Sequence, residues 1–439
     1  MEQVITTIKK VFIETYGCQM NVYDTQLVKS ILLEHQFGIV DNEADADIVM
    51  LNTCSVRDNA NRKIYNRVHE IKQRKQSTMI GVLGCMATNF KTELLDNKSL
   101  KIDFIAGPDS YKTLPNLINN LTFSGQKQYD VTLSEFETYS DVYPSHESGV
   151  NAWIAIMRGC NNFCTFCVVP YTRGRERSRD PYNIVGEVKR LVQDGFKQIT
   201  LLGQNVNSYK FENYDFADLL AMVSDVEGVE RIRYTSPHPK DYPMKLIELM
   251  KERPNICNQI HMPLQAGNDR VLHKMNRTYT KQEFLDLVTG IRAVIPDIAI
   301  STDIIVGFPT ETEAEFLDTV DVCKQVQFDS AFIFKYSERP NTRAAMKFPD
   351  DVSEADKKSR IIRLNELQNN IGLAKNKQLI GTKQQILIEE LTTKRSDDDA
   401  QGRTDCNRIV IVPKAGLAIG DLMDVTIVDA TRNVLLGAG

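Results

Sequence analysis

Residues 153–167 read Trp-Ile-Ala-Ile-Met-Arg-Gly-Cys-Asn-Asn-Phe-Cys-Thr-Phe-Cys, an apolar run followed closely by three cysteines. Trp153–Met157 is typical of a buried strand, and Cys160, Cys164 and Cys167 come next, with three and two residues between them. Cysteine thiolates are the usual ligands of iron–sulfur clusters. This spacing lets one loop hold three corners of a four-iron cube, which leaves one iron open to a small molecule. A structural zinc loop with a distant fourth ligand is the alternative, although zinc cysteines usually come in paired knuckles.

Strand-like runs separated by helical patterns continue from residue 150 to residue 375. Alternating strands and helices predict a parallel sheet, and six such units predict a partial (β/α)6 barrel with its chemistry at the carboxyl ends of the strands. Cys160 lies just beyond the first strand, where that rule places a site. The helix after it is expected to start at Asp180–Pro181 and to stop at Gly195. The predicted strands are Trp153–Met157, Ile199–Leu202, Arg231–Thr235, Gln259–Leu264, Ile298–Val306 and Ala331–Tyr336.

The first part of the chain, residues 9–125, also alternates strands and helices, which predicts an open parallel sheet covered by helices. Cys18, Cys54 and Cys85 each follow the end of a predicted strand. Parallel strands end at the same edge of a sheet, so the three cysteines should converge there. From these residues alone, a metal site and three small buried apolar side chains both remain open. The predicted strands are Val11–Tyr16, Ile48–Asn52, Met79–Leu83 and Ile102–Ile105, and the predicted helices are Asp24–His35, Asp58–Lys75 and Tyr111–Leu121.

Two further segments complete the chain. Residues 126–149 show no hydrophobic period, which is typical of a linker laid along a surface. Residues 377–439 contain β-rich runs with glycines between them, which predicts a small antiparallel β-barrel. Some barrels of this kind bind nucleic acid. The β-rich runs are Gln384–Glu389, Arg408–Val412 and Leu422–Val428.

Composition narrows the functional classes. The 439 residues carry a formal net charge of −5, which argues against a protein that coats nucleic acid non-specifically but permits a local basic patch. No apolar run reaches the length of a membrane span, and Met1–Lys10 has no features of a secretory signal. We therefore expect a cytoplasmic protein that does not contact membranes. Nine cysteines in such a protein favour metal or catalytic use over disulfides.

The cysteine run at 160–167 resembles the signature of the radical S-adenosylmethionine (SAM) superfamily. In that superfamily the open iron of a 4Fe-4S cluster binds SAM, and one electron from a reductant cleaves it to a 5′-deoxyadenosyl radical. The resemblance implies that Cys160, Cys164 and Cys167 hold the cluster. Further cofactor contacts are expected from the cysteine loop and from strand ends. The candidates are Phe166, Gly203, Gln204, Asp303 and Gly307. For Gly307, an ordinary turn at the end of a strand is an equal alternative to a cofactor contact.

The front cysteines lie in the stretches Gly17-Cys18-Gln19-Met20-Asn21, Asn52-Thr53-Cys54-Ser55-Val56-Arg57 and Gly84-Cys85-Met86. These resemble the cluster-binding stretches of the methylthiotransferases, which carry a second 4Fe-4S cluster in an amino-terminal domain. The resemblance assigns Cys18, Cys54 and Cys85 to that cluster. Together with residues 168–174, the stretches resemble the branch acting on isopentenylated adenine beside the tRNA anticodon. Residues 377–439 resemble its TRAM domain, and the resemblance covers essentially the whole chain after residue 10.

The resemblance implies that a methylthio group replaces the hydrogen on carbon 2 of that adenine. Two SAM molecules are used per turnover: one methylates sulfur at the front cluster, and the other yields the radical that removes the hydrogen. An aromatic carbon–hydrogen bond is too unreactive for side-chain acid–base chemistry, so the cofactor must perform this step. The enzyme is expected to be a monomer.

Three alternatives to this function remain. Two are methylthiolation of another target, either threonylcarbamoyladenosine in tRNA or a ribosomal protein. The motifs at Cys18 and Cys54 argue against both. The third is a non-catalytic RNA-binding metalloprotein.

Several arginines are candidates for contacts with RNA, although a charge run is usually a solvated face. The loop after the radical cysteines is the best placed, because it borders the active face. At Arg158 the chain departs from the family, which usually has an acidic residue there, and we expect this change to alter contacts to the RNA backbone. The candidates are Arg173, Arg175 and Arg177 in the loop and Arg395 and Arg403 in the small barrel.

Overall fold

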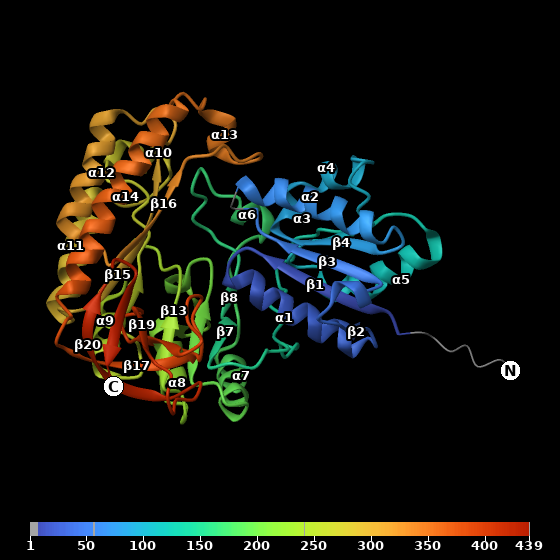
Figure 1. Ribbon diagram of the computed structural model, residues 1–439. Helices are drawn as coiled ribbons and strands as arrows, with labels where there is room; N and C mark the ends of the chain where they lie inside the picture. The colour runs from blue at the N-terminus through green and yellow to red at the C-terminus, as the bar shows by residue number, and fades with distance from the viewer. Residues whose placement is uncertain (1–7, 56–57, 241, 439) are drawn as a thin grey trace.

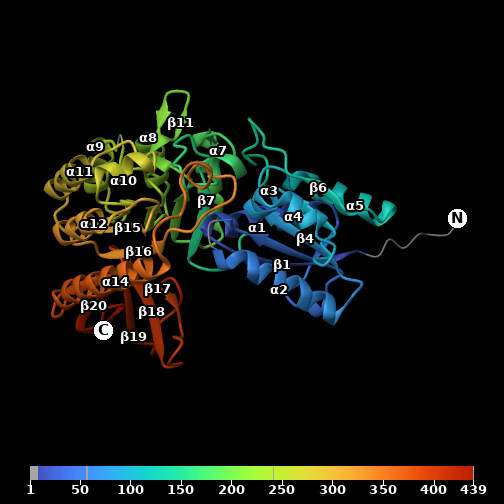
Figure 2. The same ribbon diagram turned by 90° about the horizontal axis from the view of Figure 1, so that it is seen from above.

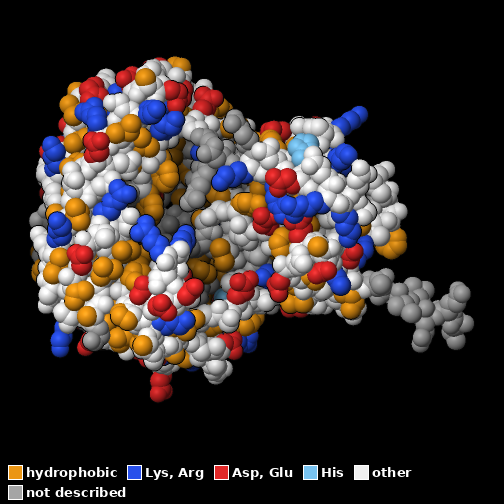
Figure 3. Space-filling view, in the orientation of Figure 1, with side chains coloured by type: hydrophobic (Ala, Val, Ile, Leu, Met, Phe, Trp, Pro, Cys, Tyr) orange, Lys and Arg blue, Asp and Glu red, His pale blue; other side chains and the backbone are white. Residues whose placement is uncertain are grey.

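The computed structural model describes residues 8–55, 58–240 and 242–438, with the backbone alone for 58–62. The chain forms two lobes (Figure 1): the amino-terminal sheet is one, and the central barrel with the carboxyl-terminal β-barrel is the other. Figure 3 shows the molecule hollowed between the lobes, with hydrophobic side chains and several Lys or Arg side chains around the hollow. In the described part of the chain, no helix has the length and apolar character that crossing a membrane requires.

The amino-terminal lobe is a six-stranded parallel sheet in the order β2-β1-β3-β4-β5-β6, which confirms the predicted open parallel sheet. The central strand β3 is buried at every residue, because helices cover both faces. The strands are β1 (Lys10–Tyr16), β2 (Gly38–Ile39), β3 (Ile48–Thr53), β4 (Met79–Gly84), β5 (Phe104–Ala106) and β6 (Gln128–Asp130). The helices are α1 (Gln19–Glu34), η1 (Glu43–Asp45), α2 (Asp58–Arg74), α3 (Cys85–Asn89), α4 (Lys91–Asp96), η2 (Tyr111–Thr113) and α5 (Leu114–Ser124).

The segment expected to be a surface linker, residues 126–149, is more integrated than its pattern indicates. It supplies edge strand β6 and the fully buried Tyr139. The Tyr139 hydroxyl donates to the Pro108 carbonyl at 3.0 Å and accepts from the Tyr111 amide at 2.9 Å. A three-residue strand and a single buried aromatic side chain leave no periodic signal in the sequence, so the prediction missed them.

The central domain contains all six predicted parallel strands, arranged as two three-stranded sheets, β13-β10-β7 and β14-β15-β16. An isolated parallel bridge connects Ile232 of the first sheet with Ile256, three residues before the second sheet begins, and one apolar core runs beneath both sheets. The barrel strands are β7 (Asn151–Ala155), β10 (Gln198–Leu202), β13 (Arg231–Tyr234), β14 (Gln259–His261), β15 (Ala299–Val306) and β16 (Ser330–Lys335). Short strands are β8 (Met157–Arg158), β9 (Arg177–Ser178), β11 (Lys210–Phe211) and β12 (Tyr214–Asp215).

Helices follow the strands and shield them from water. The first long one starts where predicted, because the Asp180 side chain accepts from the Tyr182 amide at 2.7 Å. Capping boxes at Asp215, Thr280 and Thr312 start three others, since each side chain satisfies a free backbone amide. The helices are α6 (Val169–Thr172), α7 (Pro181–Gln193), η3 (Val206–Ser208), α8 (Phe216–Ser224), α9 (Met244–Glu252), α10 (Asp269–Lys274), α11 (Lys281–Val294), α12 (Glu313–Val326), α13 (Arg343–Lys347) and α14 (Glu354–Lys377).

The carboxyl-terminal segment is a closed five-stranded barrel in the order β17-β18-β19-β21-β20, so the predicted small β-barrel is confirmed. This barrel docks on the amino ends of the central strands. Arg231, at the start of β13, donates to the carbonyls of Gln385 and Arg403. The small barrel therefore lies beside α14 (Figure 2), away from the carboxyl strand ends that carry the cysteines. Its strands are β17 (Lys383–Glu390), β18 (Asp399–Thr404), β19 (Ile409–Pro413), β20 (Leu422–Ala430) and β21 (Val434–Ala438).

Candidate functional site

The cysteine loop of the central domain starts after a break in the first strand. Strand β7 ends at Ala155, and β8 then pairs with β9, on the far side of the loop. Gly159 has φ +79°, and a Cβ there would lie 2.0 Å from the Arg175 carbonyl oxygen, so only glycine fits this turn. The Cys160 amide donates to the Gly174 carbonyl at 3.2 Å. The loop is thus folded back on itself, with Cys160 at its start.

The three sulfurs of this loop share one environment. Burial raises the pKa of Cys160 to about 11, and the charge of Cys164 acts in the same direction. Buried Arg277 donates from Nη1 to Cys164 Sγ at 3.4 Å. Arg277 lies far along the chain on a loop after α10 and belongs to no local motif, so the sequence analysis did not identify it.

The register of the amino-terminal sheet gathers the front cysteines. Tyr16 pairs with Thr53, and Thr53 pairs with Gly84, so the strand ends lie side by side. Cys18 follows the first of these ends by two residues, whereas Cys54 and Cys85 follow theirs directly. A Cβ on Gly17 would lie 2.7 Å from Cys54 Cβ. The three cysteines therefore converge at one edge of the sheet. Val56 and Arg57, at the end of the second motif, lie outside the described residues.

Two asparagines of the motifs hold the front cysteines in place. Asn52 Nδ2 donates to the Asn21 carbonyl at 2.9 Å, and Asn21 Nδ2 donates to Asn52 Oδ1 at 3.1 Å. Asn21 Oδ1 also accepts from Cys18 Sγ at 3.4 Å. Both asparagines are fully buried, and the amide pair ties the start of α1 to the end of β3.

We predict that Cys18 is the first of the six motif cysteines to be alkylated in the metal-free protein. A hydrogen bond from Cys54 lowers the pKa of Cys18 to about 6, and the positive charge of Arg173 also lowers it. Since the thiolate is the nucleophile, Cys18 should react with iodoacetamide at pH 7, whereas Cys160 should not. Mass spectrometry of time points measures this, with buried Cys257, whose pKa is raised to about 12, as the slow control. A Cys18 rate that rises only above pH 8 would contradict the prediction.

The two cysteine trios meet across the lobe interface. Helix α6, which follows the radical cysteines, packs on α3, which starts at Cys85 (Figure 1). Arg173, just after α6, donates from Nε to Cys85 Sγ at 3.2 Å. Tertiary structure thus brings the loop of one trio against the other.

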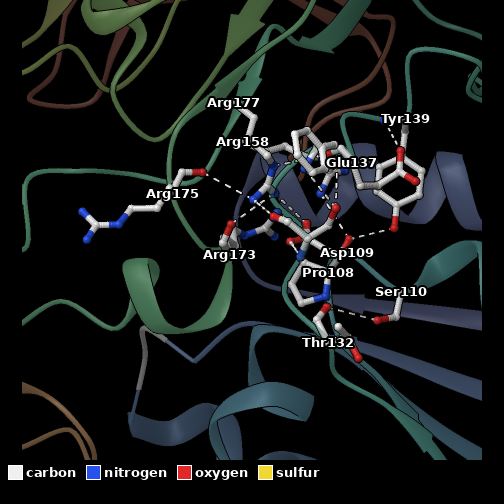
Figure 4. Close-up of polar contacts among 12 residues, drawn as sticks. Pro108, Asp109, Ser110, Thr132, Glu137, Tyr139, Arg158, Arg173, Arg175 and Arg177 are labelled. Carbon is white, nitrogen blue, oxygen red and sulfur yellow. Dashed lines mark hydrogen bonds and ion pairs between the residues drawn. The ribbon is translucent and has the colours of Figure 1, made fainter.

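Arg173 and Arg177 do not lie where RNA-binding residues are expected. Both are buried, in ion pairs with Asp24 at 2.7 Å and Asp109 at 2.8 Å. Figure 4 shows Arg175 pointing away from this group, and Arg175 is exposed. The basic character of the loop serves the lobe interface, so of these three only Arg175 stays a candidate for RNA contact.

Arg158 is also buried in the lobe interface, which corrects the expectation that it alters contacts to RNA. It is almost fully buried, donates to Asp24 Oδ1 at 2.6 Å, and stacks 4.6 Å from the Tyr139 ring centroid (Figure 4). Burial alone would raise the pKa of Asp24, but the charges of Arg158 and Arg173 hold it below its ordinary value. Asp24 is therefore a buried carboxylate shared by two guanidinium groups.

The inner wall of the barrel carries polar and aromatic side chains. In β14-β15-β16, His261 pairs with Ser301, and Asp303 pairs with Phe332. His261 Nδ1 lies 3.0 Å from Ser301 Oγ, and His261 Nε2 lies 3.2 Å from Asp303 Oδ2. Phe332 is 56% exposed and meets the His261 ring edge-on at 6.0 Å. These groups form a wall able to hold a flat, partly apolar molecule.

The remaining cofactor candidates have mixed surroundings. A Cβ at Gly203 would lie 2.8 Å from Met157 Cγ, and one at Gly307 would lie 2.4 Å from Lys357 Cγ. At both glycines, therefore, a protein side chain fills the space where a cofactor would have to approach the backbone. Gly307 has φ +71° and forms a turn at the end of its strand. Gln204 Oε1 is buried without a hydrogen-bond partner among the described residues. Phe166 is half-buried against the barrel core.

In the small barrel, Arg395 is exposed, on the loop between β17 and β18. Arg403 is paired with Glu389 at 2.9 Å, next to the docked central domain. Of these two candidates, Arg395 has the more accessible charge.

The donor sets suit four-iron clusters. Among the side chains that the structure describes, those of residues 8–55, 63–240 and 242–438, no three His, Cys, Asp or Glu residues form a group that could hold one metal ion. A four-iron cube is larger than one ion, so its thiolates stand farther apart than the ligands of zinc. Each trio has three cysteines on one loop or one sheet edge, and a buried arginine donates to one sulfur of each. Hydrogen bonds to the sulfurs are one of the factors that set the reduction potential of such a cluster.

Comparisons with known proteins agree with this arrangement. Residues 10–107 match the uncharacterized protein family UPF0004, residues 154–323 the radical SAM superfamily, and residues 377–438 the TRAM domain. A protein of Porphyromonas gingivalis, a tRNA-2-methylthio-N(6)-dimethylallyladenosine synthase, is 47% identical over 98% of this chain and 94% of its own length. The chain belongs to the tRNA-2-methylthio-N(6)-dimethylallyladenosine synthase family.

Other members of this synthase family match over the same extent. The protein of Bacteroides thetaiotaomicron is 44% identical over 98% of this chain and 96% of its own length, and that of Chloroherpeton thalassium is 46% identical over 98% and 95%. Among solved structures, the radical SAM methyltransferase TsrM of Kitasatospora setae shares the fold, with a TM-score of 0.61, 13% identity and coverage of 77% of this chain and 75% of that one.

Proposed function

We propose that this protein converts N(6)-dimethylallyladenosine beside the tRNA anticodon to its 2-methylthio derivative. The observation that carries the proposal is the identity of 44–47% to synthases of that name over 98% of the chain. The convergence of two cysteine trios at one lobe interface supports it, because the reaction needs both a radical and a sulfur donor at one base. The partners are such a tRNA and a one-electron reductant, and the place of action is the cytoplasm.

We further propose how the chain holds its cofactors. Cys160, Cys164 and Cys167 would hold the cluster that binds SAM, and Cys18, Cys54 and Cys85 would hold the second 4Fe-4S cluster. Bound there, the groups supply hydrogen abstraction and methylthio sulfur, which side chains cannot supply. Arg277 and Arg173 donate to one sulfur in each trio, and the free Oε1 of Gln204 offers an acceptor to SAM.

The inner wall of the barrel supports a nucleobase substrate. A modified adenine must leave its loop to be read by a protein, and bases stack on exposed aromatic side chains. Phe332 and Phe334 are both exposed on one face of β16. That wall would also cover the apolar prenyl group, and His261 and Asp303 beside it provide polar contacts.

We predict that Phe332→Ala raises KM for the prenylated stem-loop about tenfold, with a smaller change in kcat. Base–aromatic stacking contributes about 1–3 kcal/mol per base, and this contact exists before the chemical step. Steady-state kinetics on a synthetic anticodon stem-loop measures both constants. Phe123→Ala is the control, since Phe123 is 89% exposed at the end of α5. An unchanged KM in Phe332→Ala would remove Phe332 from the substrate site.

The proposed function is tested by anaerobic reconstitution with iron and sulfide, followed by assay on three RNAs. These are anticodon stem-loops with dimethylallyladenosine, threonylcarbamoyladenosine or plain adenosine. The proposal expects 2-methylthio product with the first alone, detected by nucleoside mass spectrometry. Product with the second RNA would assign the chain to a different substrate. A protein that binds RNA but holds no iron would favour a non-catalytic role.

A further inference from the structure

Arg173 belongs to the central domain but is buried in the amino-terminal lobe. It is 3% exposed, and its Nε donates to Cys85 Sγ at 3.2 Å while its Nη2 donates to Asp24 at 2.7 Å. A guanidinium group stays protonated in proteins at any ordinary pH. Arg173 is therefore a permanent cation in contact with one of the front cysteines.

The protein does not satisfy this guanidinium completely. Nη1 of Arg173 is buried and has no hydrogen-bond partner in the described part of the chain. A buried donor without an acceptor costs about 1–3 kcal/mol. Such a donor beside a cysteine indicates an acceptor that is not part of the polypeptide.

The charges around Arg173 point to the same conclusion. The interface group contains three guanidinium groups, those of Arg158, Arg173 and Arg177, against two carboxylates, those of Asp24 and Asp109. The remaining positive charge lies beside the front cysteines, since Arg173 Nε is 3.2 Å from Cys85 Sγ. A buried charge is unfavourable unless it is paired, so the thiolates of the front cysteines, or a cluster that they hold, complete the group.

We propose that Arg173 donates hydrogen bonds to the sulfurs of the front cluster and raises its reduction potential. This role rests on the proposed function, and Arg173 acts as a positioning residue. A cation and N–H donors stabilise the more negative, reduced state of a cluster, and hydrogen bonds to sulfur are among the factors that set its potential. Because Arg173 follows α6, it also fixes the front cluster relative to the loop of the radical cysteines.

The test isolates the front cluster. Cys160, Cys164 and Cys167 are replaced by alanine, the variant is reconstituted with iron and sulfide, and the potential is measured by a redox titration followed by electron paramagnetic resonance. In that background, Arg173→Gln is compared with Arg175→Gln, a change to an exposed arginine two residues away. We expect a more negative potential with Arg173→Gln and no shift with Arg175→Gln.

Arg173→Lys covers the case in which the glutamine variant does not fold. Lysine keeps the charge beside Asp24 but loses the planar fork of donors, so its potential should lie between those of the parent and Arg173→Gln. Equal potentials at full iron content in the parent and in the Arg173 variants would overturn the role of Arg173 alone. A background protein that takes up no iron would instead overturn the two-cluster function.

Discussion

A Cys85→Ala variant is expected to cleave SAM reductively while forming no methylthio product. Cys85 lies at the edge of the amino-terminal sheet, away from the 160–167 loop in the chain, and our assignment gives it to the sulfur-donating cluster. Cys164→Ala, in contrast, should abolish both SAM cleavage and product. For each lost activity we expect a fall of at least about a thousandfold, as when an essential catalytic group is removed. The two substitutions thus separate the roles of the two trios.

The measurement is a paired assay of 5′-deoxyadenosine and of 2-methylthio nucleoside in each variant, with iron content determined beside it. Cys257→Ala is the matched control, because Cys257 is buried in the central domain outside both trios. It should retain both activities. Methylthio product from Cys85→Ala at more than a trace would refute the ligand role of Cys85.

Asp24→Asn is expected to lower the free energy of unfolding by about 3–5 kcal/mol, the usual cost of removing one partner of a buried ion pair. Asp24 is fully buried and bonds to both Arg158 and Arg173, so the change leaves two buried guanidinium groups without their carboxylate. The only tryptophan of the chain, Trp153 on β7, packs against the apolar cluster of the amino-terminal lobe. Its fluorescence during urea unfolding therefore reports on this interface.

Asp141→Asn is the control for that experiment. Asp141 forms an exposed ion pair with Lys112, and such pairs contribute less than about 1 kcal/mol. Asp24→Asn with the same urea midpoint as Asp141→Asn would show that the buried pairs do not hold the lobes together.

The same ion pairs give a pH dependence. The pKa of Asp24 is lower in the folded protein than its ordinary value, which is about 3.9 in an unfolded chain. The stabilisation is therefore present above that pH and is lost as the pH falls through the folded pKa. Asp24→Asn should lose this part of the acid sensitivity, as urea midpoints at several acidic pH values would show.

Many features of the fold follow from local sequence. The four central strands of the amino-terminal sheet, β1, β3, β4 and β5, and the six strands of the central barrel were predictable, because buried strands in parallel sheets are short apolar runs. The short edge strands β2 and β6 were not predicted. The trio of Cys160, Cys164 and Cys167 was predictable from its spacing, and the convergence of Cys18, Cys54 and Cys85 was predictable because each of them follows the end of a predicted strand. The helix predicted to begin at Asp24 instead begins at Gln19. Acidic residues are common at helix starts, which is why the helix was expected to begin at Asp24. In the structure Asp24 lies inside the helix, and its side chain pairs with arginines of the other lobe.

What the sequence by itself determined is most of the parallel strands, the spacing of Cys160, Cys164 and Cys167, and the family motifs around Cys18, Cys54 and Cys85. Tertiary structure alone decided the partners of the arginines. Arg158, Arg173 and Arg177 read as a basic surface for RNA, and the fold buries them against Asp24 and Asp109. A sequence shows where the charges are, but whether water or a carboxylate surrounds each one depends on contacts between residues 68 to 149 positions apart.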